Sequence, residues 1–389
     1  MQDARDQTPS NVVLSTRTKV ALLVAANILV LLVAEGLAGW LLTLNHIRQP
    51  VQLGLGAVRT YSQYDADLGW AMTPNTRVED LYGPGASVTV NSQGFRGTRE
   101  YSDAVPAGLQ RIVCSGDSFT MGYGVGDHES WCFRLSTLDR SLEPLNMGQS
   151  GYGVGQAYLW YMRDGRRFDH NVHLFAFITN DFARMQRDNY EGYGKPLVHL
   201  DDDGELVVSN VPAPERLWRS PSLATRVQRL EALSTYRLLE RLIGRIDWRP
   251  AAGEASDSDP RAVASAVFAS LAHVNQQKDS TLVLVYLPRE EDFLSPETDE
   301  WRQWLEQESS RLGIAWIDVV KEMRGQSVDD WNAMFSQAHY SVEGNRFVAG
   351  VIYRALESSG LIADDPPGIE HDVRRTGPTV SAVPRDGGA

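Results

Sequence analysis

The 389-residue sequence has only two cysteines and eight histidines, and no group of them has the spacing of a metal site. Its glycine-rich GYGVG sequence lacks the lysine and serine that complete a phosphate-binding loop. A Gly-x-Ser-x-Gly motif is also absent, which disfavours the α/β-hydrolase fold. We therefore expect no metal and no other cofactor. The two cysteines, Cys114 and Cys132, either form a disulfide in an oxidising compartment or are small buried hydrophobic side chains.

The sequence also has fewer basic than acidic residues. The chain carries 37 Lys and Arg against 50 Asp and Glu, a formal net charge of −13. A nucleic-acid partner needs a basic surface, so none is expected. The balance of 42% hydrophobic and 22% charged residues is that of a globular protein with a sizeable core.

One long hydrophobic run is present near the N-terminus. Residues 20–44 read VALLVAANILVLLVAEGLAGWLLTL, and a helix of this length spans roughly 37 Å, enough to cross a bilayer. Arg17 and Lys19 precede the run, and Trp40 suits the far interface. This distribution predicts a transmembrane helix with residues 1–19 in the cytoplasm and the rest of the chain outside it, in the periplasm.

Two other interpretations of this run stay open. A cleaved signal peptide would have a shorter apolar region and a small-x-small site, and Gly36, Leu37 and Ala38 offer such a site. A buried core helix of this length would usually show a polar face. Glu35 is either a functional group in the membrane or close enough to the outer interface to reach water.

The rest of the chain divides into three parts. Residues 45–109 form a β-rich lead-in, with a hairpin edge predicted at SVTVNSQGFRG. The main domain covers residues 110–362 and contains an insertion at about 186–260. The insertion is predicted to hold a hairpin around Asp203–Gly204 and an amphipathic helix, and to be a cap, a partner surface or a decoration without chemistry. Residues 363–389 are rich in Pro, Gly, Asp and Arg, and we expect a disordered tail.

The main domain alternates between continuous apolar runs and segments of helical periodicity. This pattern predicts βαβ units with a buried parallel sheet. In such sheets ligands bind beyond the carboxyl ends of the strands, so the polar residues that follow the runs are the ones to consider. The runs read RIVCSG, EPLNMG, HLFAFI, TLVLVYLP and GIAWIDV.

Three polar or small residues follow the first three runs. Ser118, in CSGDSFTMGYGV, lies before a predicted helix, where backbone N–H groups can bind a developing oxyanion. A serine in this position is more often an N-cap. Gly151 offers an unhindered backbone N–H, or is only a turn glycine. Asn180 has an amide suited to an oxyanion hole, or it caps a helix or forms a turn.

His339 is the histidine best placed to act as a base, because it lies just before a C-terminal helix that Ser341 can cap. A histidine takes a serine proton near neutral pH and returns it to the leaving group. Other histidines lie beside the membrane segment, in the hairpin or in the tail. His170 and His173 are expected to precede a strand, at the wrong edge of the sheet.

Together, these blocks resemble the SGNH hydrolase superfamily, also called the GDSL esterases. Its blocks are named for a serine, a glycine, an asparagine and a histidine, here Ser118, Gly151, Asn180 and His339 in that order. The resemblance covers about residues 110–360, and the lead-in sequences LGWAMTPN and VNSQGFRG look like those of bacterial members with an N-terminal membrane anchor.

The resemblance implies a three-layer α/β/α fold with a mostly parallel central sheet, and ester hydrolysis through an acyl-enzyme. The oxyanion would then meet the N–H groups of Ser118 and Gly151 and the side chain of Asn180. The substrate would be a small-molecule, glycan or lipid ester outside the cytoplasm, with the membrane as a second partner through the N-terminal helix.

Two positions depart from the family pattern. The glycine usually found two residues before the asparagine is replaced by Ile178, and the aspartate usually found three residues before the histidine is replaced by Ser336. The acid that would orient the imidazole is therefore missing where the resemblance places it. Asp329, Asp330 or a backbone carbonyl could take its place, a Ser–His dyad could act alone, or the activity could be lost.

Three functions stay open at this point. The first is a membrane-anchored serine esterase acting outside the cytoplasm. The second is an O-acyltransferase for polysaccharide, in which a sugar hydroxyl rather than water resolves the acyl-enzyme. The third is a binding or assembly protein that keeps the fold without turnover.

Overall fold

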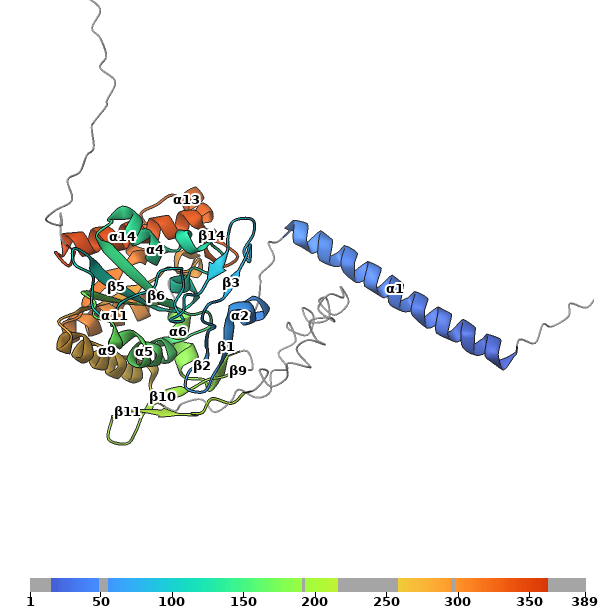
Figure 1. Cartoon of the computed structure of the whole chain (residues 1–389), viewed down its shortest axis with the longest axis horizontal. Helices are drawn as coiled ribbons and strands as arrows, with labels where there is room; N and C mark the ends of the chain where they lie inside the picture. Colours follow the sequence, from blue (N-terminus) through green and yellow to red (C-terminus); the bar gives the residue numbers. More distant parts are fainter. Residues whose placement is uncertain (1–14, 49–54, 191–192, 216–257, 295–297, 363–389) are drawn as a thin grey trace, which may run out of the picture.

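The computed structural model describes residues 15–48, 55–190, 193–215, 258–294 and 298–362. These ranges contain one long N-terminal helix, α1 (Thr16–Arg48), and an α/β domain (Figure 1). The amphipathic helix predicted within the insertion and the tail predicted for residues 363–389 lie outside the described residues.

The domain is built on a five-stranded parallel sheet with the order β13-β12-β7-β5-β6. The apolar runs of the sequence form these strands, so the predicted parallel sheet is confirmed. Numbered along the chain, the order is 2-1-3-4-5, and the direction in which strands are added reverses between β5 and β7. The strands are β5 (Gln110–Gly116), β6 (Leu142–Gly148), β7 (Val172–Phe177), β12 (Thr281–Tyr286) and β13 (Ala315–Asp318).

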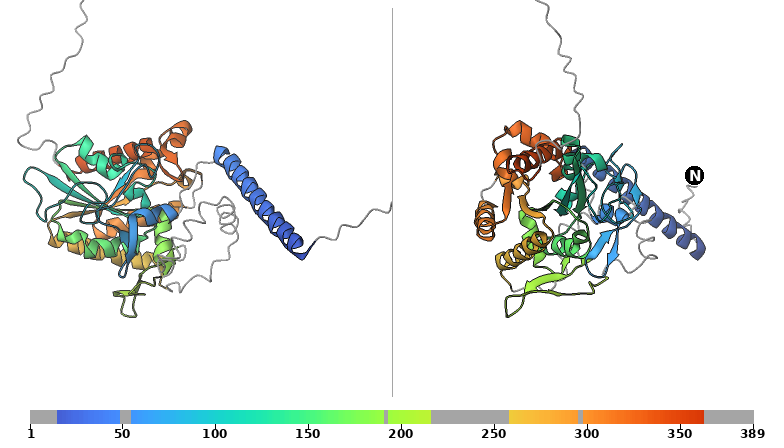
Figure 2. Two further views of the ribbon diagram at one scale, coloured as in Figure 1. Left: turned by 45° about the vertical axis from the view of Figure 1, so that its right-hand side comes forward. Right: turned by 60° about the vertical axis from the view of Figure 1, so that its left-hand side comes forward.

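Helices cover both faces of the sheet, which confirms the three-layer α/β/α fold (Figures 1 and 2). Successive side chains of a strand point to opposite faces. Ile112 and Cys114 of β5 therefore pack with one helical layer, and Val113 packs with the other. One layer contains α4 (Trp131–Leu138), α12 (Val319–Met323) and α14 (Val342–Ser358), and the other contains α5 (Val154–Arg163), α9 (Pro260–Gln277) and α11 (Asp299–Leu312).

The lead-in packs directly on this domain. Buried side chains of the lead-in join the domain's clusters, with Trp70 and Phe95 in the core beneath α5. Its elements are helix α2 (Leu55–Tyr61) and the antiparallel pairs β1 (Ser62–Asp65) with β2 (Gly69–Met72) and β3 (Arg77–Val78) with β4 (Val88–Thr89).

The described part of the insertion packs on the lead-in. The Tyr64 hydroxyl donates to the Ala213 carbonyl at 2.7 Å, and the Ala213 N–H donates to the Ala66 carbonyl at 2.7 Å. The hairpin expected around Asp203–Gly204 is present. The insertion's strands are β8 (Asn189–Tyr190), β9 (Tyr193–Gly194), β10 (Leu197–Leu200) and β11 (Leu206–Ser209).

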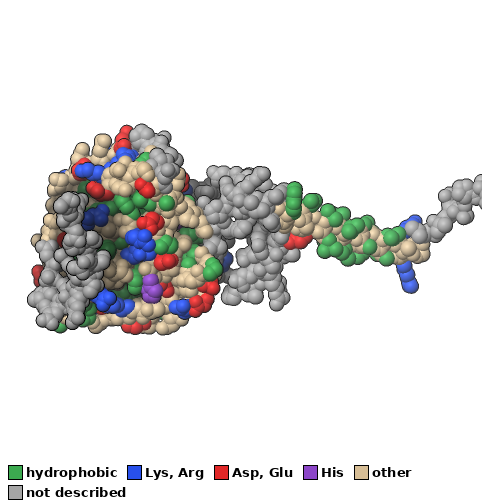
Figure 3. Space-filling model, turned by 90° about the horizontal axis from the view of Figure 1, so that it is seen from above, with side chains coloured by type: hydrophobic (Ala, Val, Ile, Leu, Met, Phe, Trp, Pro, Cys, Tyr) green, Lys and Arg blue, Asp and Glu red, His purple; other side chains and the backbone are tan. Residues whose placement is uncertain are grey.

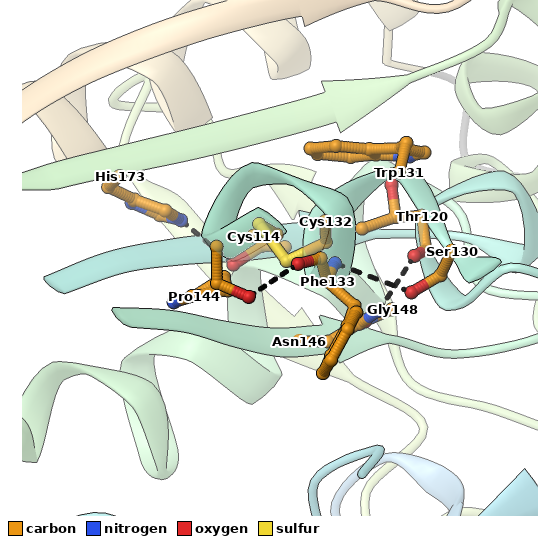
Figure 4. Close-up of a disulfide and its surroundings, with 12 residues drawn as sticks. Cys114, Thr120, Ser130, Trp131, Cys132, Phe133, Pro144, Asn146, Gly148 and His173 are labelled. Atoms are coloured by element: carbon orange, nitrogen blue, oxygen red, sulfur yellow. Dashed lines mark hydrogen bonds between the residues drawn. A yellow bond between two sulfur atoms is a disulfide. The ribbon is translucent and has the colours of Figure 1, made fainter. Parts of the chain in front are cut away.

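A disulfide joins Cys114 of β5 to Cys132 of α4, so it links the sheet to a helix packed on its face (Figure 4). This resolves the two interpretations of the cysteines in favour of the disulfide. Disulfides persist in oxidising compartments such as the bacterial periplasm and are rare in the cytoplasm.

Helix α1 exposes apolar side chains between Val20 and Trp40, and Figure 3 shows basic side chains at its N-terminal end. The segment Thr16–Leu37 is long and apolar enough to cross a membrane, with a mean hydropathy of 2.4. Arg17 and Lys19 lie in its first turn. A membrane anchor and a signal sequence both fit this segment.

A buried polar network lies on one side of the sheet. The His173 ring nitrogens contact the Ser115 hydroxyl at 2.8 Å and the Asn275 amide nitrogen at 3.1 Å. The Asn275 amide oxygen is 3.1 Å from both His170 Nε2 and the Tyr161 hydroxyl. His173 is the second residue of β7 and does not precede it, so the expectation was wrong for His173, whereas His170 does precede the strand. A histidine with partners for both ring nitrogens can be buried in a strand.

We expect the two buried histidines to destabilise the domain as the pH falls below about 6.5. Burial lowers the pKa of His170 and lowers that of His173 further. The unfolded chain then binds protons that the folded chain does not, so stability is fully present above the ordinary histidine pKa and is lost as pH falls. Each histidine contributes up to ~1.4 kcal/mol per pH unit until its folded pKa is reached.

Urea unfolding of the full chain in detergent at pH 7.5, 6.5 and 5.5 measures this slope. His173→Gln should flatten the slope, whereas His273→Gln, at an exposed position of α9, should leave it unchanged. A slope that His173→Gln leaves unchanged would contradict the expectation.

Candidate active site

Three of the predicted site residues follow neighbouring strands at one edge of the sheet. Ser118 opens the short helix α3 (Ser118–Met121) after β5, and Asn180 lies in α6 (Thr179–Met185) after β7. Gly151 follows β6, on the other side of β5. The strand order reverses between β5 and β7, and in open α/β sheets such a reversal at the carboxyl edge is where ligands bind.

Ser118 and His339 are in direct contact. The Nε2 atom of His339 is 2.9 Å from the Ser118 hydroxyl oxygen, although the two residues are 221 positions apart in the sequence. Asp117 is the N-cap of α3, because its carboxylate accepts the Phe119 N–H at 2.9 Å. The interpretation of Ser118 as an N-cap is therefore wrong, and its hydroxyl is available to the imidazole.

A backbone carbonyl orients the His339 ring. Its Nδ1 atom is 3.1 Å from the Gln337 carbonyl oxygen, which only accepts hydrogen bonds. The neutral ring therefore carries its proton on Nδ1 and presents Nε2 as the acceptor for the Ser118 hydroxyl. Asp330 does not take this part, because its carboxylate accepts from the Ser327 hydroxyl at the start of α13 (Val328–Met334).

Gln337 and Ala338 form the two-residue turn between β14 (Phe335–Ser336) and β15, which begins at His339. Their φ angles are +53° and +60°, as in a type I′ turn that usually contains Asn and Gly. This conformation costs non-glycine residues ~1–3 kcal/mol each and persists only where the surroundings hold it. Here the Tyr340 hydroxyl donates to the Pro288 carbonyl at 2.7 Å, which ties β15 to the domain.

Two aromatic rings cover the imidazole. The ring centroids of Phe119 and Tyr123 lie 4.7 Å and 4.5 Å from that of His339. Burial lowers the pKa of His339 below its ordinary value, against the opposing effect of the hydrogen bond to the Gln337 carbonyl. The ring is therefore neutral at pH 7, the state in which it can accept a proton.

This pKa predicts the pH dependence of ester hydrolysis. We expect kcat/KM to be constant above about pH 7 and to fall in acid as His339 is protonated, with the midpoint below 6.5. Nitrophenyl acetate hydrolysis by the full chain between pH 4.5 and 8 measures the profile. Ser336→Asp supplies a carboxylate three residues before the histidine and should move the midpoint to higher pH. An unsubstituted chain whose midpoint lies above 6.5 would contradict the assignment.

Asn180 is held by an arginine that the sequence analysis missed. Arg289 Nη1 donates to the Asn180 amide oxygen at 2.7 Å. Only the oxygen of an amide can accept from a guanidinium, so the Asn180 NH2 group remains as a donor. Asn180 is exposed. It does not cap α6, because the N-cap residue is Ile178, whose N–H donates to the Asp181 carboxylate at 3.0 Å.

Gly151 lies in a tight turn beneath an aromatic ring. Its φ is +82°, and a Cβ atom added there would be 2.8 Å from Cε1 of Tyr190. Both facts require glycine, so the turn alone accounts for the residue. In the described part of the chain, no acceptor binds the backbone N–H of Gly151 or that of Ser118.

Two buried carboxylates and a half-buried arginine join the loops around Ser118. Arg184 Nη1 donates to Asp181 at 2.7 Å, to Asp117 at 3.3 Å and to the Tyr152 carbonyl at 3.2 Å. Burial raises the pKa of Asp181 well above its usual range, and the charge of Asp117 acts in the same direction. Because the acceptors come from the loops after β5, β6 and β7, this cluster fixes the three loops relative to one another.

The lead-in holds the loop that contains Gly151. The Tyr61 hydroxyl is 2.9 Å from the Ser150 hydroxyl, and the Trp70 indole N–H donates to the Ser150 carbonyl at 3.0 Å. The Gln149 amide donates to the Ser62 hydroxyl at 2.9 Å. Residues of α2, β1 and β2 thus set the position of the loop after β6.

Arg96 of the lead-in holds the other end of the nucleophile helix. Its side chain is buried, with the residue 4% exposed, and it donates to the carbonyls of Met121, Gly122 and Val125, the last two at 2.6 Å. Its Nε atom is 3.3 Å from the Asp127 carboxylate. Met121 is the last residue of α3, and its carbonyl has no N–H partner within the helix.

The described residues contain no group of three His, Cys, Asp or Glu side chains that could hold a metal ion. Among the four predicted site residues, the structure brings Ser118 and His339 into contact. Gly151 and Asn180 follow β6 and β7, the strands on either side of β5, at the same edge of the sheet. Neither makes a hydrogen bond to Ser118 or His339 in the described part of the chain.

No protein-family model matches the sequence, and no curated protein matches it. Solved structures of GDSL-type proteins are similar to the chain. A lipolytic G-D-S-L family member from Veillonella parvula is 12% identical, with 63% of this chain and 97% of that chain covered and a TM-score of 0.37. A putative lipolytic G-D-S-L protein from Desulfitobacterium hafniense is 15% identical, with 64% and 99% covered and a TM-score of 0.37. An acetylxylan esterase from Geobacillus stearothermophilus is 12% identical, with 64% and 94% covered and a TM-score of 0.38.

Proposed function

We propose that the protein is a serine hydrolase of the GDSL type that cleaves acyl esters through an acyl-enzyme, with Ser118 as nucleophile and His339 as base. The observation that carries the proposal is the 2.9 Å contact between His339 Nε2 and the Ser118 hydroxyl, with the tautomer set by the Gln337 carbonyl. A protein that only binds a ligand or partner would not need a serine–histidine pair. The pair therefore favours a catalytic function over the non-catalytic alternative.

In the first half of the reaction, the Ser118 oxygen attacks the ester carbonyl carbon while its proton passes to His339 Nε2. The Gln337 carbonyl accepts the Nδ1–H bond throughout and stabilises the imidazolium. The negative charge on the former carbonyl oxygen is met by the N–H groups of Ser118 and Gly151 and by the Asn180 amide. Collapse expels the alcohol, which takes the proton from His339.

In the second half, water attacks the acyl-enzyme and His339 takes its proton. The same donors stabilise the second oxyanion, and collapse releases the carboxylic acid and restores the Ser118 hydroxyl. A backbone carbonyl carries no charge, so it stabilises the imidazolium less than a carboxylate would. A Ser–His pair with a carbonyl partner is therefore expected to work with a lower rate than a full triad.

We further propose that α1 anchors the domain to the membrane, with the domain in an oxidising compartment outside the cytoplasm. The exposed apolar surface of α1, the basic residues Arg17 and Lys19 at its start, and the Cys114–Cys132 disulfide support this placement. Alkaline extraction of membranes tests it, because an anchored chain stays in the pellet and a chain released after signal cleavage does not.

Covalent labelling tests the proposed nucleophile. A fluorophosphonate probe added to the full chain in detergent should modify Ser118, and Ser118→Ala should abolish both the label and nitrophenyl acetate hydrolysis. Ser150→Ala, which removes another buried hydroxyl near the site, should remain labelled. Labelling that persists in Ser118→Ala would contradict the proposal. An acyl group released faster to a sugar than to water would reassign the protein as an acyltransferase.

A further inference from the structure

One buried carboxylate beside the active-site loops has no part in the reaction described above. Asp292, in the short helix α10 (Glu291–Leu294) after β12, is only 1% exposed. Burial raises the pKa of this carboxyl group, because the charged form loses its water. The guanidinium of Arg289, three residues earlier, pairs with Glu291 at 2.6 Å instead. The hydrogen bonds of Asp292 must therefore offset the unfavourable burial of its charge.

One oxygen of this carboxylate holds the backbone of Arg289. The Arg289 N–H donates to Asp292 Oδ2 at 2.6 Å, while the side chain of the same arginine donates to the Asn180 amide oxygen at 2.7 Å. The backbone of Asp292 is held in turn, because Arg324 Nε donates to its carbonyl at 3.1 Å. Asp292 thus fixes the point from which the Arg289 guanidinium reaches Asn180.

The other oxygen is linked to the residue before Asn180. Tyr286, at the end of β12, donates its hydroxyl to Asp292 Oδ1 at 3.2 Å, and the same hydroxyl contacts the Thr179 hydroxyl. An ionised carboxylate only accepts hydrogen bonds, and a tyrosine hydroxyl has one proton. Thr179 therefore donates to Tyr286, and Tyr286 donates to Asp292. Thr179 is the first residue of α6, and Asn180 is the second.

The two paths meet at Asn180, one at its side chain and one at its backbone. An oxyanion donor has to lie about 3 Å from the place that the charged oxygen will occupy. A misplacement of about 1 Å can cost 10²-fold in rate. Asn180 is exposed, so close packing does not hold its side chain and its hydrogen bonds decide where the NH2 group lies.

We propose that Asp292 is a positioning residue that keeps Asn180 in the oxyanion hole. It acts on the Asn180 side chain through Arg289, and on the Asn180 backbone through Tyr286 and Thr179. The inference rests on the proposed esterase function. The role needs hydrogen-bonding atoms in a fixed place and not a negative charge, so an amide of the same shape can fill it. The amide oxygen would accept from the Arg289 N–H, and its NH2 group would donate to the Tyr286 hydroxyl.

Two substitutions of similar size test the role in the full chain. Asp292→Asn should keep kcat for nitrophenyl acetate within about threefold, and Asp292→Leu, without polar atoms, should lower kcat by about 10–100-fold. KM should stay within about twofold in both, because the oxyanion forms only after the substrate has bound. Tyr286→Phe breaks one of the two paths and should lie between them. Tyr161→Phe, which removes another buried hydroxyl, should leave kcat unchanged.

A double-mutant cycle shows whether Asp292 acts through Asn180. Two residues that act through the same contact are not additive. In a chain that already carries Asn180→Ala, Asp292→Leu should lower kcat by no more than about twofold further. The inference is overturned if Asp292→Leu lowers kcat by the same factor in both backgrounds, or if Asp292→Asn is as slow as Asp292→Leu.

Hydrogen–deuterium exchange of the Ser118→Ala chain measures the positioning without turnover. Residues 178–185 should exchange about tenfold faster in Asp292→Leu than in Asp292→Asn, because the start of α6 is held less firmly. Residues of α9 should exchange alike in both variants, which shows that the domain is folded. If Asp292→Leu accelerates exchange in α9 as well, Tyr286→Phe takes its place in both measurements.

Equal exchange of residues 178–185 in the two variants overturns the inference. A failure of the esterase proposal looks different. In that case the unsubstituted chain is not labelled by the fluorophosphonate and does not hydrolyse nitrophenyl acetate, whatever the exchange shows. Faster exchange in Asp292→Leu without any turnover in the unsubstituted chain would mean that Asp292 holds α6 but that Asn180 is no oxyanion donor, which also overturns the inference.

Discussion

Replacing His339 with glutamine is expected to lower kcat for nitrophenyl acetate by about 10²–10⁴-fold at pH 7. Glutamine can still contact the Ser118 hydroxyl, but it cannot take the proton. The unassisted hydroxyl is a poor nucleophile, so acylation slows by the whole contribution of the general base. Stopped-flow or steady-state release of nitrophenol measures kcat, and the fluorophosphonate labelling rate of Ser118 should fall in parallel.

The matched control is His273→Gln, the same substitution at an exposed position of α9. It should keep kcat within a factor of two. Thermal unfolding of both variants should show that the domain is still folded at the assay temperature. If His339→Gln retains kcat within about threefold, some other group takes the serine proton and the assignment of the base is wrong.

The strands and their edge were predictable from the sequence because they are local features. Most residues of the central strands are apolar, as a sheet buried on both faces requires. The chemistry-bearing residues follow those runs, and parallel strands bring their carboxyl ends to one edge. Ser118 and His339 could therefore be named together, although nothing in the sequence sets their distance.

The groups that position the catalytic pair were not predictable, because their roles depend on tertiary contacts. Every residue has a carbonyl, so the one at Gln337 becomes distinctive only through the turn that aims it at His339. Nothing in the sequence around Arg184 or Arg289 distinguishes them from arginines on the protein surface. Their partners, Asp117 and Asn180, come from loops after other strands. Sequence spacing carries no information about such pairs.

The role of the whole lead-in segment also depends on tertiary contacts and could not be predicted from its sequence. Its sequence predicted only short strands and turns before the main domain. In the structure its side chains fasten two loops of the active site, through Trp70 to the loop after β6 and through Arg96 to the end of α3. We infer that the segment that follows α1 is part of the catalytic unit and not a spacer.

Arg96→Met is therefore expected to lower the free energy of unfolding by ~3–5 kcal/mol, the usual loss when one partner of a buried ion pair is removed. The substitution leaves the Asp127 carboxylate, 9% exposed, without its guanidinium. It also leaves the carbonyls of Met121 and Val125 without a donor among the described residues. Because α3 also carries Ser118, the serine is then held less firmly, and kcat should fall by about 10²-fold. Urea unfolding and nitrophenyl acetate hydrolysis measure the two effects.

Arg99→Met is the control from the same segment. Arg99 also pairs with a carboxylate, that of Glu143 at 3.1 Å, but its side chain is 53% exposed, so its loss should cost less than ~1 kcal/mol and leave kcat unchanged. Arg96→Lys keeps the charge but not the planar fork that reaches several carbonyls, and should lie between the two. If Arg96→Met and Arg99→Met changed the free energy of unfolding and kcat equally, Arg96 would have no specific role in positioning the nucleophile.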